Sequence, residues 1–340
     1  MSQAHPMGGK PLMAGFDALL FDLDGVVYVG PAAVPHAAES IAAARAAGMA
    51  CSFVTNNASR SGQSVVTHLV EIGVVADVDD VITSPQAAVT LLPGYVPDGA
   101  RVLVIGGSGI DEALVDGGYV PVRTLADGPL AVMQGFSPDI SWRDLAEATF
   151  AVRSGLPWIA TNPDLTFPAA GGIAPGNGAL VRVVAETVGR GPDAVAGKPE
   201  PPLLLAAIAR TGATRPLMIG DRLDTDIAAG SRVGIPSLLV FTGVTTLAEL
   251  LSAIPEERPA YLGADLRVLH APYPTIEIGP DEARCGGAVA RRDDEHLDIA
   301  VGTDPWDAVR AAAALAWTST DDGRTLDCDD ALARLAAALG

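Results

Sequence analysis

Short apolar runs alternate with amphipathic stretches along most of this chain. The apolar runs have the length of buried strands, whereas the longer stretches place apolar residues on one helical face and end at glycine. Residues 35–48 and 59–73 are predicted helices that end at Gly48 and Gly73, with a predicted strand at 49–55 between them. Strands that alternate with helices in this way predict an α/β fold with a doubly wound parallel sheet.

The same alternation returns in the second half of the chain. Helices are predicted at 181–189, 201–212 and 224–234, and strands at 193–197, 216–220 and 236–241. The intervening segment has apolar runs of its own at 101–106, 130–135 and 157–161. We therefore predict a discontinuous core domain (residues 1–81 and 179–268) with an inserted α/β cap domain (82–178).

The chain changes character after about residue 268. A proline-rich segment leads into a possible hairpin between 283–292 and 296–302, and two alanine-rich helices follow. These features predict a small α+β extension at 269–340, with Trp306 and Trp317 in its core. It contains no catalytic constellation, so a stabilising role is the simplest interpretation. A dimer contact or a regulatory site remains an alternative.

Composition and charge exclude several classes of protein. The chain is 49% hydrophobic, but it has no run of 18 apolar residues, and a membrane-spanning helix needs about 20. Its first residues lack the apolar segment of a signal peptide, so a cytoplasmic location is expected. Cys51, Cys285 and Cys328 are too scattered for a disulfide framework or a zinc site. A net charge of −19 disfavours nucleic acid and anionic membranes as partners.

Acidic, hydroxyl and amine side chains follow the predicted core strands. They are Asp22, Asp24, Thr55, Lys198 and Asp221. Because ligands of an open parallel sheet bind beyond the carboxyl ends of its strands, we expect these side chains to converge. Carboxylates that gather in this way repel each other and any phosphate, by roughly 4 kcal/mol per pair of charges about 4 Å apart at an effective dielectric of 20. A magnesium ion and the lysine would reverse that balance.

Four motifs resemble, in order, those of haloacid dehalogenase-like (HAD) phosphatases. They are "DLDG", "VTNN", "GKPE" and "GDRLDTD", and the resemblance covers residues 15–266. It implies that Asp22 is the nucleophile that forms an aspartyl-phosphate and that Asp24 is the general acid and base. It further implies the remaining roles: phosphate binding by Thr55, the Asn56 amide and Lys198, and Mg²⁺ binding by Asp22, Asp221 and the Asp24 backbone carbonyl, with Asp226 in support.

The spacing of the motifs and several short sequence segments narrow the resemblance to one branch. Thr55 and Lys198 are 143 positions apart, which leaves room for a cap domain between them. The segments "TNNASRS", "VMQGF", "ATNPDLTFP" and "PGNGAL" are similar to the type 2 capped, 4-nitrophenylphosphatase-like branch. The loop with Asn162 and Asp164 is the expected substrate loop of the cap. Ser137 stands where the branch usually has an aspartate, so the cap lacks one acid.

The resemblance implies an Mg²⁺-dependent phosphomonoesterase that acts on a small metabolite. Glycerol 3-phosphate is the preferred substrate, with 2-phosphoglycolate and pyridoxal phosphate as alternatives, and a homodimer is possible. Asp24 favours phosphoryl transfer over dehalogenation, because a halide leaving group needs no proton. An alternative of another class is a regulatory protein that binds a phosphometabolite without turnover.

Each motif taken alone has a simpler explanation. Asp22 and Asp24 are of a type common in turns, and Asp226 could cap the helix that follows it. Lys198 alone would be typical of a solvated surface lysine. His36, His68 and His270 are isolated, and "GGSGIDEAL" has Glu112 where a dinucleotide loop needs its third glycine. The ordered set of motifs, and no single one, favours the phosphatase.

Overall fold

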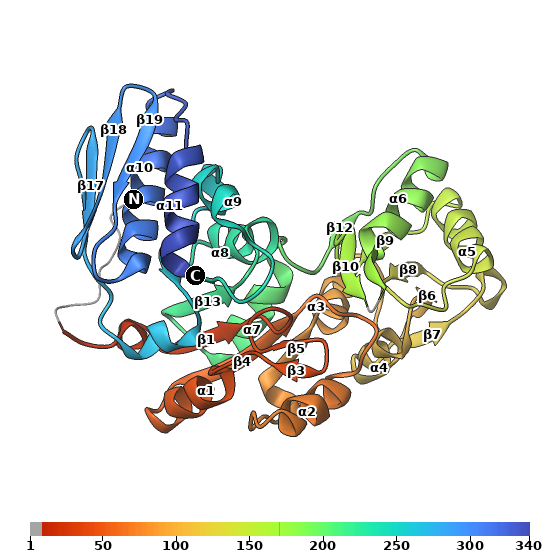
Figure 1. Ribbon diagram of the computed structural model, residues 1–340. Coiled ribbons are helices and arrows are strands. Elements are labelled where there is room, and N and C mark those ends of the chain that lie inside the picture. Colours follow the sequence, from red (N-terminus) through yellow and green to blue (C-terminus); the bar gives the residue numbers. More distant parts are fainter. Residues whose placement is uncertain (1–8, 170) are drawn as a thin grey trace. The chain divides into compact units, whose positions relative to one another are not determined.

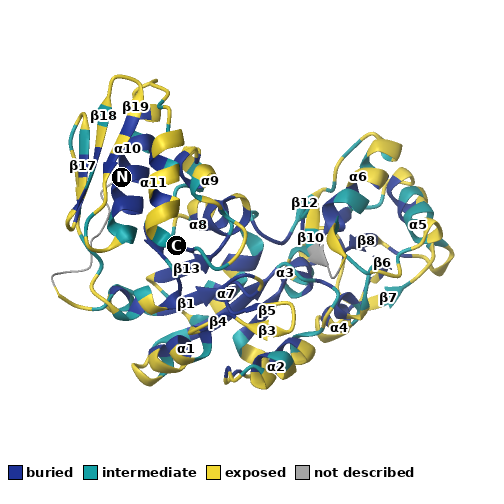
Figure 2. Ribbon diagram, viewed as in Figure 1, coloured by how far each residue is buried: buried dark blue, intermediate teal, exposed yellow. Residues whose placement is uncertain are grey.

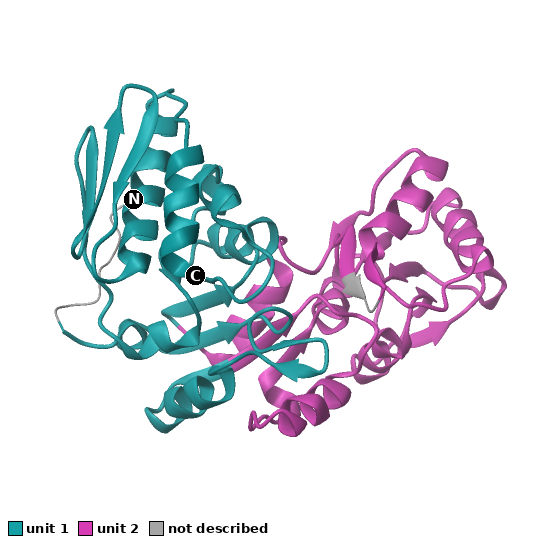
Figure 3. Ribbon diagram, viewed as in Figure 1, with its two compact units in different colours: residues 1–51, 214–340 teal, residues 52–213 magenta. Residues whose placement is uncertain are grey.

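The computed structural model describes residues 9–169 and 171–340 and consists of two compact units (Figure 3). Unit 1 comprises residues 1–51 and 214–340, and unit 2 comprises residues 52–213. Residues 1–8, where no signal peptide is expected, and Ala170 of the cap loop lie outside the described residues. The domain boundaries drawn from the sequence, at 81/82, 178/179 and 268/269, stay a prediction.

Parallel strands form the centre of unit 1 in the order β15-β14-β13-β1. Figure 1 labels β13 and β1. Their bounds are Ala18–Phe21 (β1), Pro216–Gly220 (β13), Ser237–Val240 (β14) and Tyr261–Gly263 (β15). Every residue of these strands is buried, as is typical of a parallel sheet covered on both faces. The predicted α/β fold class is confirmed.

The helices of this part of unit 1 are short. They are α1 (Ala37–Ala46), α8 (Ala228–Val233) and α9 (Leu247–Leu251), with a π-helical turn, η5 (Leu223–Ile227), and the 3₁₀ turns η1 (Leu12–Gly15), η6 (Pro255–Glu257) and η7 (Leu266–His270). A small hairpin pairs β2 (Tyr28–Val29) with β3 (Ala32–Ala33). The helix predicted at 224–234 is therefore interrupted, since its first turn is π-helical.

The C-terminal extension belongs to unit 1 and shares a hydrophobic core with it. An antiparallel sheet in the order β16-β17-β18-β19 carries two helices (Figure 1). The bounds are Ile276–Ile278 (β16), Glu282–Cys285 (β17), Ala288–Asp293 (β18), His296–Ala300 (β19), Pro305–Asp321 (α10) and Asp329–Leu339 (α11). The predicted hairpin is present as β18–β19, and β17 adds a strand before it. One cluster of buried residues joins this layer to Leu239 and Leu262 of the parallel sheet.

Alanine dominates the contact between α10 and the rest of unit 1. The helix is buried along most of its length, whereas α11 buries only one face (Figure 2). The prediction that Trp306 and Trp317 form the core of the extension is wrong, because both are only partly buried and pack at its margin. Short alanine side chains let α10 lie close to its neighbours, and this leaves no space for an indole ring between them.

Buried polar contacts also tie the extension to β15. The Arg310 guanidinium is 5% exposed, donates to the Leu262 carbonyl oxygen at 3.1 Å and to Asp307 at 2.8 Å, and lies 5.0 Å from the centre of the Tyr273 ring. Burial raises the pKa of Tyr273 to about 12 and that of the Cys285 thiol to about 12. Both groups are therefore neutral at neutral pH, as expected for side chains buried in a structural contact.

Unit 2 contains two groups of parallel strands. The first is the pair β4 (Ala50–Thr55) and β5 (Val81–Thr83), and the second is a sheet in the order β12-β9-β8-β6-β7. The bounds of the second group are Arg101–Ile105 (β6), Val120–Val122 (β7), Ala131–Gln134 (β8), Trp158–Ala160 (β9) and Ala194–Val195 (β12). All three strands predicted between 101 and 161 are present.

Helices and one hairpin complete unit 2. Their bounds are Gly62–Glu71 (α2), Ser84–Leu91 (α3), Ser108–Asp116 (α4), Trp142–Arg153 (α5), Asn177–Val188 (α6) and Pro202–Thr211 (α7), with β10 (Thr166–Ala169) and β11 (Gly172–Pro175) in the hairpin and the 3₁₀ turns η2 (Val78–Asp80), η3 (Leu92–Gly94) and η4 (Leu125–Asp127). Helices α5 and α6 pack on the second sheet around Trp158. Among the described residues, no helix has the length and apolar character needed to cross a bilayer.

Leu315→Ala tests whether the extension is part of the folding core of unit 1. Leu315 lies on α10 and is fully buried within the cluster shared with the parallel sheet. We therefore expect the substitution to lower the free energy of unfolding by about 2–5 kcal/mol. Urea unfolding measures this loss. The matched control, Leu205→Ala, alters a half-exposed leucine of α7 and should cost less than about 1 kcal/mol. Equal, small losses for both variants would contradict a core shared through Leu315.

Candidate active site

Three carboxylates of unit 1 lie together beyond the ends of two adjacent strands. One oxygen from each of Asp22, Asp221 and Asp226 lies within 4.8 Å of the others. Strands β1 and β13 pair in register, Phe21 opposite Ile219, so the residues that follow them emerge at the same edge of the sheet. Asp22 is 8% exposed, and Asp221 and Asp226 are fully buried. The structure therefore brings together three of the four acids selected from the sequence.

Asp226 reaches this cluster through the π-helical turn that follows β13. The backbone N–H of Asp226 and that of Ile227 both donate to the Arg222 carbonyl oxygen, at 3.1 and 3.2 Å. The Asp226 carboxylate in turn accepts from the backbone N–H groups of Asp221 (3.2 Å) and Arg222 (3.1 Å). Asp226 thus holds the backbone of Asp221 while its own carboxylate stays in the cluster. Single π-helical turns are frequent at functional sites.

The loop after β14 fixes the Asp221 side chain. The backbone N–H of Val244 donates to Asp221 Oδ2 at 2.7 Å, and the Thr242 hydroxyl donates to the Gly25 carbonyl oxygen at 2.6 Å. A Cβ atom on Gly243 would lie 2.0 Å from Asp221 Oδ2, and one on Gly25, which has φ +89°, would lie 2.5 Å from it. Only glycine fits at these two positions while the carboxylate keeps its place.

Asp24 differs from the other acids of the motif because it is exposed. It lies in a turn where it forms a bridge to Tyr28, and the Gly25 N–H donates to the Tyr28 carbonyl oxygen at 2.8 Å. The cluster of three carboxylates does not include the Asp24 side chain. An exposed carboxylate can exchange protons with solvent and with a substrate, which is compatible with the predicted role in acid–base chemistry.

In unit 2, the end of β4 presents a buried hydroxyl. Thr55 is 3% exposed, and its Oγ1 accepts from the Asn57 backbone N–H at 3.1 Å. The Asn57 side-chain oxygen accepts from the N–H and the hydroxyl of Ser59, at 2.9 and 2.8 Å. These local bonds form a hydrogen-bonded turn that begins at the strand end.

Lys198 lies at the same strand end and is not a surface lysine. It is 2% exposed, and its Nζ donates to the Val54 carbonyl oxygen at 3.3 Å. The Asn56 side chain binds the Lys198 backbone on both sides: Oδ1 accepts from the Lys198 N–H at 2.8 Å, and Nδ2 donates to the Lys198 carbonyl oxygen at 2.9 Å. The ammonium thus lies buried against the carbonyl of the residue that directly precedes Thr55.

The loop with Asn162 and Asp164 also contacts Asn56. Asn56 Nδ2 lies 3.1 Å from both carboxylate oxygens of Asp164, and Asn162 Nδ2 donates to the Asn56 carbonyl oxygen at 2.7 Å. The Ser84 hydroxyl donates to that carbonyl at 2.8 Å. The sequence selected Asn56 for its backbone amide but missed its side chain, and it missed Ser84. The spacing of residues gives no signal for either, because the partners are 28 to 142 positions apart.

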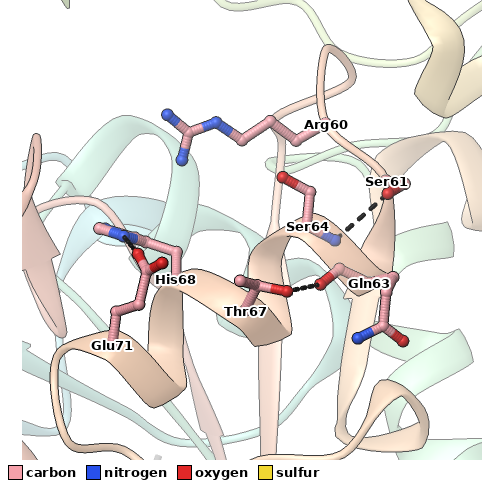
Figure 4. Close-up of a pocket in the computed structure, with 7 residues that line it drawn as sticks. All are labelled: Arg60, Ser61, Gln63, Ser64, Thr67, His68 and Glu71. Carbon is pink, nitrogen blue, oxygen red and sulfur yellow. Dashed lines mark hydrogen bonds and ion pairs between the residues drawn. The ribbon is translucent and has the colours of Figure 1, made fainter.

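Ser137, at the position where the branch is expected to have an aspartate, makes a local contact. Its hydroxyl accepts from the Asp139 backbone N–H at 3.3 Å, and neighbouring Phe136 packs edge-on against Phe167 at 4.7 Å between ring centres. A shallow polar depression of about 560 Å³ lies along α2 (Figure 4). Its lining consists of Arg60, Ser61, Gln63, Ser64, Thr67, His68 and Glu71. None of these was selected as a site residue.

Two family models match the chain. The haloacid dehalogenase-like hydrolase model covers residues 19–120, and the HAD-hydrolase-like model covers residues 195–269. The D-glycerol 3-phosphate phosphatase of Mycobacterium tuberculosis is 41% identical over 315 residues, which are 91% of this chain and 88% of that protein. The acid sugar phosphatase of Staphylococcus aureus is 35% identical over 240 residues, 70% of this chain and 91% of its own.

Solved structures show the same relationships. The glycerol phosphate phosphatase of Mycobacterium tuberculosis in complex with magnesium has a TM-score of 0.79 at 40% identity, covering 91% of this chain and 92% of its own. The p-nitrophenyl phosphatase of Archaeoglobus fulgidus has a TM-score of 0.69 at 29% identity, covering 75% and 98%. The chain belongs to the haloacid dehalogenase-like hydrolases, in the branch of phosphatases that includes the 4-nitrophenylphosphatases.

Proposed function

We propose that this protein is a cytoplasmic, Mg²⁺-dependent phosphatase that hydrolyses glycerol 3-phosphate, with Asp22 as the nucleophile. The cluster of Asp22, Asp221 and Asp226 beyond two adjacent strands carries the proposal, because buried carboxylates whose oxygens lie within 4.8 Å of one another are typical of a site for a divalent cation. Similarity to the D-glycerol 3-phosphate phosphatase over 91% of the chain supports the substrate. The net charge of −19 supports a small-molecule partner in preference to nucleic acid or membrane, and a homodimer stays a prediction.

The donor set fits magnesium. Mg²⁺ prefers oxygen ligands and is bound in proteins by one or two carboxylates with water and phosphate oxygens. Asp22, Asp221 and the Asp24 backbone carbonyl would hold the ion, and Asp226 would support Asp221. When bound, the ion supplies positive charge that offsets the carboxylates and attracts the phosphoryl oxygens of the substrate.

The reaction proceeds in two displacements on phosphorus. An Asp22 carboxylate oxygen attacks the phosphorus, the bond to the glycerol oxygen breaks, and Asp24 gives its proton to that oxygen. Asp24 then takes a proton from a water molecule, whose oxygen attacks the aspartyl-phosphate and releases inorganic phosphate and Asp22. Lys198, Thr55 and the Asn56 amide hold the phosphoryl oxygens. Division into two displacements and positioned proton transfer are both established sources of rate enhancement.

The substitution Asp22→Asn tests the nucleophile. An amide oxygen is a poor nucleophile, so we expect the rate of phosphate release to fall by more than about 10³-fold while the thermal unfolding midpoint stays close to the wild-type value. The matched control is Asp322→Asn, which removes the same charge from an exposed position of unit 1. Near-normal turnover by Asp22→Asn would contradict the covalent mechanism.

A substrate panel tests the leaving group and the need for metal. Steady-state rates on glycerol 3-phosphate, 2-phosphoglycolate, pyridoxal phosphate and a sugar phosphate should give the highest kcat/KM for glycerol 3-phosphate. Removal of Mg²⁺ with a chelator should abolish turnover, and added Mg²⁺ should restore it. Tight binding of these esters without turnover on any of them would favour a regulatory protein instead.

The substitution Gly243→Ala tests the placement of Asp221. The added methyl group would meet Asp221 Oδ2 at 2.0 Å, so the carboxylate must move. Displacement of groups that orient a metal ligand typically costs 10–100-fold in metal affinity, and we expect the half-saturating Mg²⁺ concentration to rise by roughly tenfold. Gly15→Ala, where an added Cβ meets nothing within 4 Å, is the control. An unchanged Mg²⁺ requirement would show that Asp221 does not bind the ion.

A further inference from the structure

We propose that Asp164 and Asn56 form a positioning pair that places Lys198, so that Asp164 acts on phosphate binding through Asn56 and not by contact with substrate. The proposal rests on the function proposed above, in which Lys198 holds the phosphoryl oxygens. It assigns to the Asn56 side chain, and to an acid of the cap loop, a role that the motifs do not define.

The hydrogen bonds of Asn56 fix which way its amide points. Its Oδ1 accepts from the Lys198 N–H, and its Nδ2 donates to the Lys198 carbonyl oxygen. A rotation that exchanged the two ends would place donor against donor and acceptor against acceptor. The side chain therefore clamps the peptide groups on both sides of the Lys198 Cα.

Asp164 holds this clamp in place. The Asn56 amide nitrogen has two hydrogens, and its contacts are the Lys198 carbonyl oxygen at 2.9 Å and the two Asp164 oxygens at 3.1 Å. Hydrogen bonds to a carboxylate are stronger than those between neutral groups. Asn162 links the two residues a second time, because its Oδ1 accepts from the Asp164 N–H at 3.2 Å and its Nδ2 donates to the Asn56 carbonyl oxygen at 2.7 Å.

The same contacts join Lys198 to the end of β4. Asn56 directly follows Thr55, and Ser84 and Asn162 hold the Asn56 carbonyl from two sides. The Lys198 ammonium is buried against the Val54 carbonyl oxygen at 3.3 Å. Because the Asn56 side chain anchors the Lys198 backbone, a shift of Asn56 also moves the Lys198 ammonium relative to the Thr55 hydroxyl. Both groups are proposed ligands of the same phosphoryl group.

Charge also favours an indirect role for Asp164. A phosphate monoester is an anion, so a carboxylate in contact with its phosphoryl oxygens would repel it. Asn162 is 3% exposed and gives its amide to the Asn56 carbonyl. The two polar residues expected to line the substrate loop are thus directed at Asn56.

Kinetics with two leaving groups test the proposal. In the full-length enzyme with Mg²⁺, we expect Asp164→Ala to lower kcat by roughly tenfold on both glycerol 3-phosphate and 4-nitrophenyl phosphate, and to raise the inhibition constant of inorganic phosphate by a similar factor. The half-saturating Mg²⁺ concentration should not change. The charge-matched control, Asp116→Asn, removes an exposed carboxylate of unit 2 and should match the wild type.

Two results would overturn the proposal. The first is a higher KM for glycerol 3-phosphate alone, with the inhibition constant of inorganic phosphate unchanged. That result would indicate that Asp164 contacts the glycerol group directly. The second is behaviour identical to the control. Should Asp164→Ala not fold, the isosteric Asp164→Asn gives the same comparison: a smaller loss in the same pattern supports the proposal, and no loss contradicts it. A wild-type enzyme that hydrolyses neither ester would instead refute the proposed function.

Exchanging the hydrogen-bond donor and acceptor between residues 56 and 164 gives a test whose expected result a loss of stability would not produce. Asn56→Asp places a carboxylate oxygen against Asp164 and should lower kcat by more than Asp164→Ala does. In the double variant Asn56→Asp with Asp164→Asn, a donor again faces an acceptor, so we expect partial recovery of kcat and of phosphate inhibition. Recovery is partial because one oxygen of the introduced carboxylate still faces the Lys198 carbonyl. A double variant no better than Asn56→Asp alone would contradict the pairing.

Discussion

Three carboxyl groups whose oxygens lie within 4.8 Å of one another constrain the structure of unit 1. Two carboxylates about 4 Å apart repel by roughly 4 kcal/mol at an effective dielectric of 20, so the cluster of Asp22, Asp221 and Asp226 needs compensation. Backbone N–H groups supply part of it, two to Asp226 and one, from Val244, to Asp221. These donors come from the loops after β13 and β14. The local structure of both loops therefore follows from the requirement to keep the carboxylates together, and a bound cation would add further positive charge.

The extension contributes to the same unit by a different kind of contact. Its alanine-rich helix α10 shares one hydrophobic cluster with the parallel sheet, and Arg310 donates to β15. The 315 residues aligned with the glycerol 3-phosphate phosphatase exceed the 268 that precede the extension, so that relative shares at least part of it. The p-nitrophenyl phosphatase covers only 75% of the chain. The extension thus shares a hydrophobic cluster with the parallel sheet, and a stabilising role for it stays a prediction.

The sequence predicted the parts that depend on local pattern. Apolar periodicity located the strands, and the motif order selected Asp22, Asp221 and Asp226, which the structure brings together. Two kinds of feature could not be predicted. The wrong prediction for Trp306 and Trp317 shows that side-chain size alone does not identify a core residue. The distance between the packed elements decides which side chain fits between them. The role of the Asn56 side chain depends on partners that follow it by 108 and 142 positions, and a single sequence gives no sign that such residues meet.

Neutral amides position charged groups in both units. In unit 1, backbone N–H groups bind the carboxylates of Asp221 and Asp226. In unit 2, the Asn56 carboxamide binds the backbone of a buried lysine on one side and the Asp164 carboxylate on the other. A neutral carboxamide can thus transmit the position of the acid to the lysine backbone through hydrogen bonds alone. The acid therefore places the lysine through the amide, next to the strand end that also presents Thr55.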